Sequence, residues 1–223
     1  MKRVLSMIFV LALAAGQVPA AHAADAQRVV DGARSTVIKL RNDKVLGSTA
    51  RDLLHRARAV LIVPRLVKVG FILAGEGGTG VLLVRDPKEG WSYPAFYGLG
   101  GGSVGFQIGG EISRVMLIIM SERALEAVMR DQFKIGAEAD LTVATLSAGA
   151  EAATTSNAGA DIYAVAGSKG LFGGVSLKGA VISARPKLDA DYYERSVSAE
   201  DIVLHHAVLN AFADALRSTL AKP

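Results

Sequence analysis

The segment DIYAVAGSKGLFGGVSLKG, residues 161–179, contains five glycines and two lysines, Lys169 and Lys178. Apolar residues alternate on both sides of its glycine-rich centre, which predicts two short strands joined by a loop. Leu171 and Phe172 stand together in that loop. The segment therefore predicts a hairpin whose apolar, positively charged tip suits an anionic and greasy ligand. It holds no evident catalytic group.

The chain before this hairpin contains further strand-like patterns. Apolar, β-branched runs separated by Pro64 and by a glycine cluster predict neighbouring antiparallel strands at 59–63, 67–74 and 81–85. The alternating stretch at 106–118 predicts a long strand that is buried on both faces near its end. These strands and the hairpin predict a mostly antiparallel, glycine-rich sheet.

Helical spacing of apolar residues occurs at both ends of the chain and once in the middle. It predicts an N-terminal helix over 26–58, a short helix over 121–130 and a final helix over 198–220, with serine caps on the last two. The N-terminal helix either packs its apolar stripe on the core or lies on a membrane surface. Together, the elements predict an α+β fold with one compact domain.

The first 23 residues are typical of a secretory signal peptide. A basic start precedes an apolar run at 4–15, and Ala-His-Ala at 21–23 is a small-residue cleavage pattern. We therefore expect cleavage near Ala23, a mature domain over 24–223 and a periplasmic location. The chain has no cysteine, which excludes disulfides, thiolate catalysis and cysteine-based zinc sites.

Charge is distributed unevenly along the chain. The net charge of +4 falls to +2 (4 − 2) once Lys2 and Arg3 are removed with the leader. Residues 25–58 carry eight Lys/Arg against four Asp/Glu, and residues 161–187 carry four against one. No stripe of interleaved aromatic and basic residues is present, so a nucleic-acid partner is not expected.

The stretch GGGSVG at residues 100–105 matches two motifs at once. One is the dinucleotide fingerprint, and the other is the nucleophile elbow of an α/β-hydrolase with Ser103 as the nucleophile. Each motif requires a strand followed by a helix, whereas the alternating residues that follow predict another strand. We expect these glycines to allow close backbone packing in a curved sheet. A serine esterase that uses Ser103 is a remote alternative.

The histidines and paired aspartates predict no metal site. Adjacent residues of a helix point about 100° apart, so His205 and His206 are not expected to bind one ion. His206 is expected on the core stripe of the final helix. The pair Asp189 and Asp191 lacks the glycine and distal glutamate of an EF-hand loop. We therefore expect no metal, no cofactor and no enzymatic activity.

Four motifs, in this order along the chain, resemble the SYLF domain family. They are WxxPAF at 91–96, GGGSVGFQxGxE at 100–111, DIY at 161–163 and SKGLFGGVSLxG at 168–179. The resemblance covers about residues 26–220 and implies a compact α+β domain that binds membrane lipids. It implies phosphoinositide binding for eukaryotic members and actin binding for some of them. The chain resembles the exported bacterial branch, for which actin binding is not expected.

These observations predict a non-catalytic, peripheral lipid-binding module of the bacterial envelope. The predicted lipid-binding residues are Lys169, Leu171, Phe172, Lys178 and Arg185. The three basic residues are expected to attract anionic phospholipid, and the two apolar residues to insert shallowly. Leu171 and Phe172 could instead be core residues beside a glycine-shaped turn. The alternative function is a periplasmic protein that binds another protein or itself.

Overall fold

The computed structural model describes residues 18–70, 73–104, 109–130, 132–137, 143–147, 159–169, 177 and 179–222. Its helices are α1 (Val18–Arg41), α2 (Gly47–Arg56), α3 (Glu122–Met129), α4 (Pro186–Tyr193), α5 (Ala199–Val203), the 3-10 helix η1 (Ala211–Ala213) and α6 (Asp214–Ala221). Its strands are β1 (Ala59–Gly70), β2 (Leu73–Asp86), β3 (Gly90–Trp91), β4 (Ala95–Val104), β5 (Gly109–Ile119), β6 (Phe133–Lys134), β7 (Val143–Ser147), β8 (Ile162–Lys169) and β9 (Val181–Ala184).

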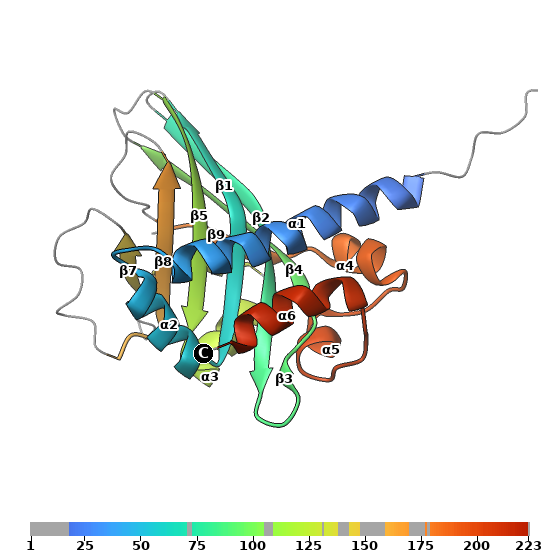
Figure 1. Cartoon of the computed structure of the whole chain (residues 1–223). Coiled ribbons are helices and arrows are strands. Elements are labelled where there is room, and N and C mark those ends of the chain that lie inside the picture. Colours follow the sequence, from blue (N-terminus) through green and yellow to red (C-terminus); the bar gives the residue numbers. More distant parts are fainter. Residues whose placement is uncertain are drawn as a thin grey trace, which may run out of the picture.

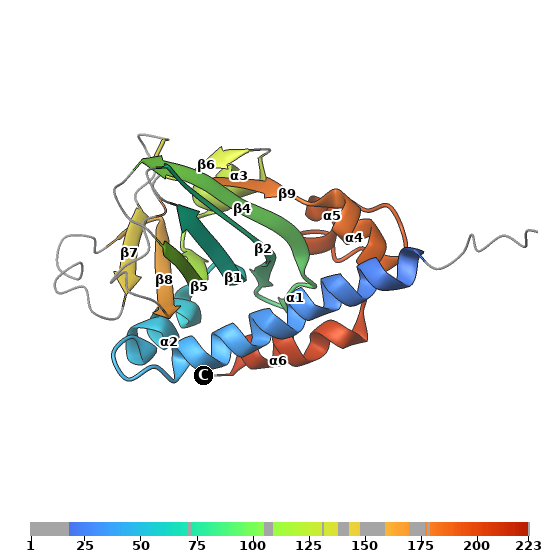
Figure 2. The same cartoon turned by 90° about the horizontal axis from the view of Figure 1, so that it is seen from above.

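These strands form one curled sheet in the order β6-β9-β4-β2-β1-β5-β8-β7, with β3 paired to β2 (Figure 1). Every pair is antiparallel except β7 with β8. Figure 2 shows α1 and α6 along one side of the curl and α3 with β6 on the other. The predicted α+β fold with a mostly antiparallel sheet is confirmed.

Helix α1 packs on the sheet through the apolar stripe that the sequence predicted. Its buried residues recur at helical spacing, from Ala26 and Val30 to Val37 and Leu40. The helix approaches β1 closely, because a Cβ atom added to Gly32 would lie 2.9 Å from the Cβ of Pro64. No helix in the described part of the chain has the length and apolar character that a membrane crossing requires.

The predicted separation of two strands at Pro64 is wrong. The run at 59–63 and the first part of the run at 67–74 meet in the single strand β1, which continues through the proline to Gly70, whereas residues 73 and 74 begin β2. The registers with both neighbouring strands shift around Pro64, so the missing proline N–H coincides with a bulge and not with a regular ladder position. The glycine cluster at 75–78 is likewise no break, because it lies inside β2.

Strand β5 has the predicted alternation, and both of its faces are buried from residue 115 to 119. At its beginning the polar residues are the covered ones. Glu111 and Ser113 are buried, and the Ser113 hydroxyl donates a hydrogen bond to Glu111 Oε1 at 2.9 Å. Ile112 between them is 46% exposed. The covered face of the sheet therefore begins with a polar pair, and an aliphatic side chain faces outward.

The first strand of the predicted hairpin at 161–179 is confirmed, and most of the second, expected around Val175 and Leu177, lies outside the described residues. The first strand is β8, which pairs with β5 and β7. The following strand is β9, which pairs with β4 and β6. In the order of the sheet, β8 and β9 are separated by four strands. The segment therefore connects two distant parts of the sheet, and its two flanking strands do not form a hairpin.

The N-terminal and middle helices are confirmed. The region 26–58 folds as α1 and α2 with a short turn between them, and the α3 cap is Ser121, whose Oγ accepts the Ala124 N–H at 3.2 Å. The aromatic segment at 91–96 contains the end of β3 and the start of β4 and is buried throughout.

The single C-terminal helix predicted over 198–220 is wrong. Ser198 caps α5 as expected, since its Oγ accepts the Asp201 N–H at 3.0 Å, but α5 ends at Val203. His206 then adopts a left-handed backbone conformation with φ of 51°, which a continuing right-handed helix does not permit. The predicted stripe is therefore interrupted, and Leu209 within it is 80% exposed.

Candidate functional site

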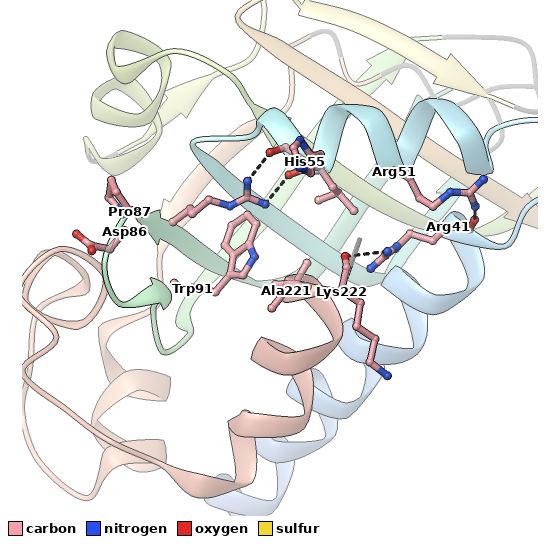
Figure 3. A pocket seen from close by; sticks show the side chains of 12 residues that line it. Arg41, Arg51, His55, Asp86, Pro87, Trp91, Ala221 and Lys222 are labelled. Carbon is pink, nitrogen blue, oxygen red and sulfur yellow. Dashed lines mark hydrogen bonds between the residues drawn. The ribbon is translucent and has the colours of Figure 1, made fainter.

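Three helices end close together on the side of the fold that carries α1 and α6. They are α1, α2 and α6, and a groove formed by two adjoining cavities of about 380 and 390 Å³ lies among them. We call this the basic groove. Figure 3 shows its side chains. It is lined by Arg34, Ile38, Arg41, Asn42, Arg51, Leu54, His55, Arg85, Asp86, Pro87, Gly90, Trp91, Thr219, Leu220, Ala221 and Lys222.

Arginines fill the open carbonyl positions at these helix ends. Arg41 donates to the carbonyl oxygens of Thr219 and Lys222 at 2.8 and 2.9 Å, at the end of α6. Arg51 donates to the carbonyl of Arg41, at the end of α1. Since the last carbonyls of a helix have no partner within it and carry partial negative charge, these guanidinium groups stabilise the helix ends.

Arg85 performs the same task for α2 from the neighbouring strand β2. It donates to the carbonyl oxygens of Leu54 and His55 (Figure 3). Its guanidinium also lies over the Trp91 ring, 4.6 Å from the ring centre. Burial lowers the pKa of Arg85, and burial together with the charge of Arg51 lowers the pKa of Arg41. The inner wall of the groove is therefore built from desolvated cations held by carbonyl groups.

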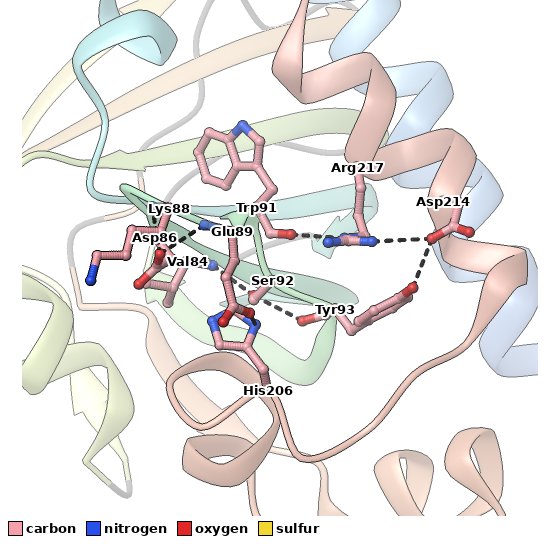
Figure 4. Close-up of polar contacts among 10 residues, drawn as sticks. All are labelled: Val84, Asp86, Lys88, Glu89, Trp91, Ser92, Tyr93, His206, Asp214 and Arg217. Atoms are coloured by element: carbon pink, nitrogen blue, oxygen red, sulfur yellow. Dashed lines mark hydrogen bonds and ion pairs between the residues drawn. The ribbon is translucent and has the colours of Figure 1, made fainter.

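The wall at Trp91 is itself fixed by contacts with α6. Arg217 donates to the Trp91 carbonyl oxygen at 2.7 Å and lies 4.1 Å from the centre of the Tyr93 ring. The Tyr93 hydroxyl donates to Asp214 at 2.9 Å (Figure 4). Strand β3 and helix α6 are thus held together by a chain of polar contacts, which keeps this side of the groove in place.

The turn beside this wall is also held by polar contacts. The Asp86 carboxylate accepts hydrogen bonds from the backbone N–H groups of Glu89 and Lys88. Both bonds lower the pKa of Asp86, and the bond from Glu89 has the larger effect. A carboxylate oxygen of Glu89 lies 3.5 Å from His206 Nδ1 (Figure 4). His206 therefore contacts the β2–β3 turn, and the prediction of a position on a continuous helical core stripe is wrong.

The outer rim of the groove combines positive charge with exposed apolar side chains. Arg51 and Lys222 are exposed, and the Lys222 side chain points away from the helix ends (Figure 3). Ile38 on α1 is 40% exposed, and Val45 in the turn between α1 and α2 is 67% exposed. Lys44 beside Val45 is also exposed. This rim has the basic and apolar character that the sequence predicted for residues around 169.

Of the five residues predicted from sequence, the structure describes Lys169 and Arg185, and neither lines the basic groove. Leu171, Phe172 and Lys178 are outside the described residues. Lys169 ends β8, where its Cα is the register partner of Ile112 in β5. Arg185 precedes α4, and its N–H donates to the Phe96 carbonyl at 2.8 Å.

The Arg185 guanidinium lies over Gly98, since a Cβ atom there would be 2.6 Å from Nε. Arg185 thus packs on β4, whereas Lys169 ends β8, and in the order of the sheet β4 and β8 are separated by β2, β1 and β5. The two predicted cations therefore belong to different parts of the sheet.

The glycine motifs at 100–105 do not have the geometry of a cofactor or catalytic site. Ser103 lies inside β4, where its register partner is Ala74. The three glycines before it also lie inside β4, so the strand does not end where either motif requires a turn. His205 contacts Asp201 at 3.1 Å. Within the described ranges, no group of three or more His, Cys, Asp or Glu residues could hold a metal ion.

The basic groove was not predicted, although part of its signal was present. The excess of positive charge in 25–58 and the membrane-surface alternative for that helix both concern residues that now line the groove. The other walls come from β2, β3 and α6, which are far away in sequence. Only the fold brings them to the end of α1.

Known proteins are similar to this chain over most of its length. The family model Ysc84, described as Las17-binding protein actin regulator, matches residues 100–223. "SH3 domain-containing YSC84-like protein 1" of Homo sapiens is 30% identical over 171 residues, which are 75% of this chain and 49% of the relative. "LAS seventeen-binding protein 3" of Saccharomyces cerevisiae is 30% identical over 155 residues, 68% of this chain and 34% of the relative. The chain spans half the length of these relatives or less.

Proposed function

The chain belongs to the Ysc84 (SYLF) family, and from that membership we propose that it is a non-catalytic module that binds anionic phospholipid at a membrane surface. The observation that carries the proposal is the rim of the basic groove, where Arg51, Lys222 and the exposed Ile38 line one cavity, and where the chain continues from the lining residue Asn42 into a turn with exposed Lys44 and Val45. Cations attract the negative head groups, and aliphatic side chains enter the boundary between head groups and acyl chains.

The expected affinity is weak and reversible. Each cation near an anionic surface contributes about 1 kcal/mol, so Lys44, Arg51 and Lys222 contribute about 3 kcal/mol together. Burying an aliphatic side chain completely contributes about 1.5–3 kcal/mol, and Ile38 and Val45 are already partly covered. A few kcal/mol from each source gives an attachment that salt can reverse, in contrast to a permanent anchor.

The proposal includes export to the bacterial periplasm. It is supported by the signal-peptide pattern of residues 1–23 and by the absence of cysteine. Among the described side chains, those that form the core begin at Ala26, just after the expected cleavage point. Las17 binding and actin regulation are named for the family and its eukaryotic relatives. We do not extend actin binding to a periplasmic protein.

A comparison of two double variants tests the proposal. Residues 24–223 are mixed with neutral phosphatidylcholine vesicles or with vesicles that also contain phosphatidylglycerol, and bound protein is sedimented at rising salt. We expect binding only to anionic vesicles, release by salt, and a loss of at least tenfold in Lys44→Glu/Lys222→Glu. The matched variant Lys169→Glu/Lys178→Glu makes the same change of charge at the site predicted from sequence.

The outcomes show which of the two sites binds the vesicles and whether the attraction is electrostatic. If only the variant at 169 and 178 loses binding, the groove is the wrong site. Equal binding to neutral and anionic vesicles would refute the electrostatic mechanism.

A second function, binding of another protein or of a second copy, is favoured by one observation. Leu209 and Phe212, in and beside the connection between α5 and α6, are 80% and 75% exposed. A concentration-dependent increase in mass without any vesicle binding would support this function.

A further inference from the structure

One end of the sheet carries an uncharged outer face that α1 does not cover. It contains the exposed side chains of Val69 and Ile112 and four glycines, Gly75, Gly77, Gly100 and Gly110, and we call it the glycine field. Val69 is the register partner of Gly75 and Gly110. Gly77 is the partner of Gly100, and Val67 connects Gly77 to Ile112. Since register partners and alternate residues share a face, these positions lie on one face of four neighbouring strands.

The packing within the protein does not require these four glycines. Among the described residues, a Cβ atom at Gly75 or Gly77 would meet nothing within 4 Å, and the nearest atoms to one at Gly100 or Gly110 are 3.7 and 3.8 Å away. The next glycines along β2 differ, because a Cβ atom at Gly78 would lie 2.5 Å from a backbone oxygen.

Glycine inside a strand weakens it, so glycines without an internal reason indicate that another molecule approaches the backbone. The expectation of close packing, which concerned the glycines at 100–105, therefore fits Gly101, where a Cβ atom would lie 3.2 Å from the Ala180 Cα, but not Gly100.

Three charged residues of the same strands, Lys68, Glu76 and Glu111, lie on the opposite face, whereas Arg114, two residues after Ile112, borders the field on its own face. Lys68 is the register partner of both Glu76 and Glu111, one residue out of phase with the field. Burial raises the pKa of Glu76, and the charge of Lys68 opposes this change. The backbone groups under the field pair with neighbouring strands in the ladder. The field therefore offers a ligand apolar contact and close approach, and few hydrogen bonds.

The size of the field decides the kind of ligand. Four strands about 4.8 Å apart and four residues of about 3.3 Å each give a surface of about 250 Å². A stable protein interface buries about 800 Å² on each partner, which is more than the field provides. A single hydrocarbon chain is narrow and flexible enough to lie on such a strip.

From these observations we propose that the glycine field binds one acyl chain of a lipid. The proposal rests on the proposed lipid binding for the class of ligand, and it adds the part of the lipid that is recognised. It also places a basic residue at the margin of the site, because Lys169 is the register partner of Ile112.

The test uses a neutral monoacylglycerol with a diazirine in its acyl chain, so that head-group charge plays no part. Photo-crosslinked peptides should map to β1, β2, β4 and β5. In Gly75→Thr/Gly77→Thr we expect at least tenfold weaker binding by native mass spectrometry, because the backbone can no longer be approached and two hydroxyls face the chain. The melting temperature should not fall, since threonine favours strands and both positions are open. Leu209→Thr, which alters an exposed apolar residue far along the chain, should bind normally.

Each result has one meaning. Unchanged affinity in the double threonine variant, or crosslinks confined to other elements, would overturn the acyl-chain site even if anionic vesicles bind as proposed. A doubled mass that the threonine variant abolishes would assign the field to a second copy of the chain and also overturn it. Loss of the neutral probe in the threonine variant without any binding to anionic vesicles would refute the proposed head-group binding and leave the acyl-chain site standing.

Discussion

Replacing Asp189 with asparagine should remove a large pH dependence of stability. Asp189 lies in the first turn of α4 and is fully buried. Its Oδ1 accepts the Phe96 N–H at 2.9 Å, whereas its Oδ2 has no hydrogen-bond partner among the described residues. Burial raises the pKa of this carboxyl to about 7, against a smaller opposite effect of the Phe96 N–H.

The sign follows from proton binding in the two states. An unfolded aspartate has a pKa of about 3.9, so between about pH 4 and pH 7 the folded state keeps a proton that the unfolded state has lost. Stability therefore falls as the pH rises, by about 1.4 kcal/mol for each pH unit. The folded and unfolded pKa values of Asp189 differ by about three units, so the total loss of stability is about 4 kcal/mol. Burial also raises the pKa values of the nearby Tyr97 and Tyr193, so neither ionises in this range.

Asparagine keeps an oxygen for the Phe96 N–H and cannot ionise. The free energy of unfolding of Asp189→Asn, relative to the wild type, should therefore increase by about 4 kcal/mol between pH 4 and pH 8. Urea titrations followed by the fluorescence of Trp91, the one tryptophan of the chain, measure this difference. Asp52→Asn removes an exposed carboxylate from α2 and serves as the control. Parallel pH profiles of Asp189→Asn and the wild type would refute the reasoning.

Two further changes test the helix ends. Arg41→Met should lower the free energy of unfolding, measured by urea titration, by about 2–3 kcal/mol, because the carbonyl groups of Thr219 and Lys222 lose a charged donor. Arg34→Met is the control. An equal loss of stability in both variants would contradict a special role of Arg41. Ser121→Ala should cost about 1–2 kcal/mol in the same titrations, because it removes the α3 cap and the hydrogen bond that the Ser121 hydroxyl donates to Asp161 at 2.7 Å, and Ser121→Thr, which keeps both contacts, should restore most of it.

Elements determined by their own residues could be predicted from the sequence. The stripe of α1 and the Ser121 cap of α3 are local patterns, and they have the expected outcome. The prediction of a strand break at Pro64 was wrong, because β1 accommodates the proline in a bulge between its two neighbouring strands. The prediction of one final helix was wrong, because the apolar spacing continues through His206 although the backbone turns there and brings the His206 side chain to Glu89.

The candidate site was harder to predict because its parts are distant in sequence. Lys169 and Arg185 are 16 positions apart, but Lys169 ends β8 and Arg185 follows β9, and these two strands are not neighbours in the sheet. Arg41 and Thr219 are 178 positions apart and are bonded directly. The basic composition of 25–58 indicated an anion-binding surface, but not the walls that shape it.

The bonds from Arg41 to the carbonyl groups of residues 219 and 222 also concern the order in which the chain is made. The first long helix of the domain contributes a cap to the last one, so neither can reach its final packing until nearly all residues have been synthesised. Closing so long a loop is slow, because its entropy is lost before the contact forms. The packing of α1 against α6 is therefore expected to form late, which agrees with the proposed export, because a secretory channel requires an unfolded chain.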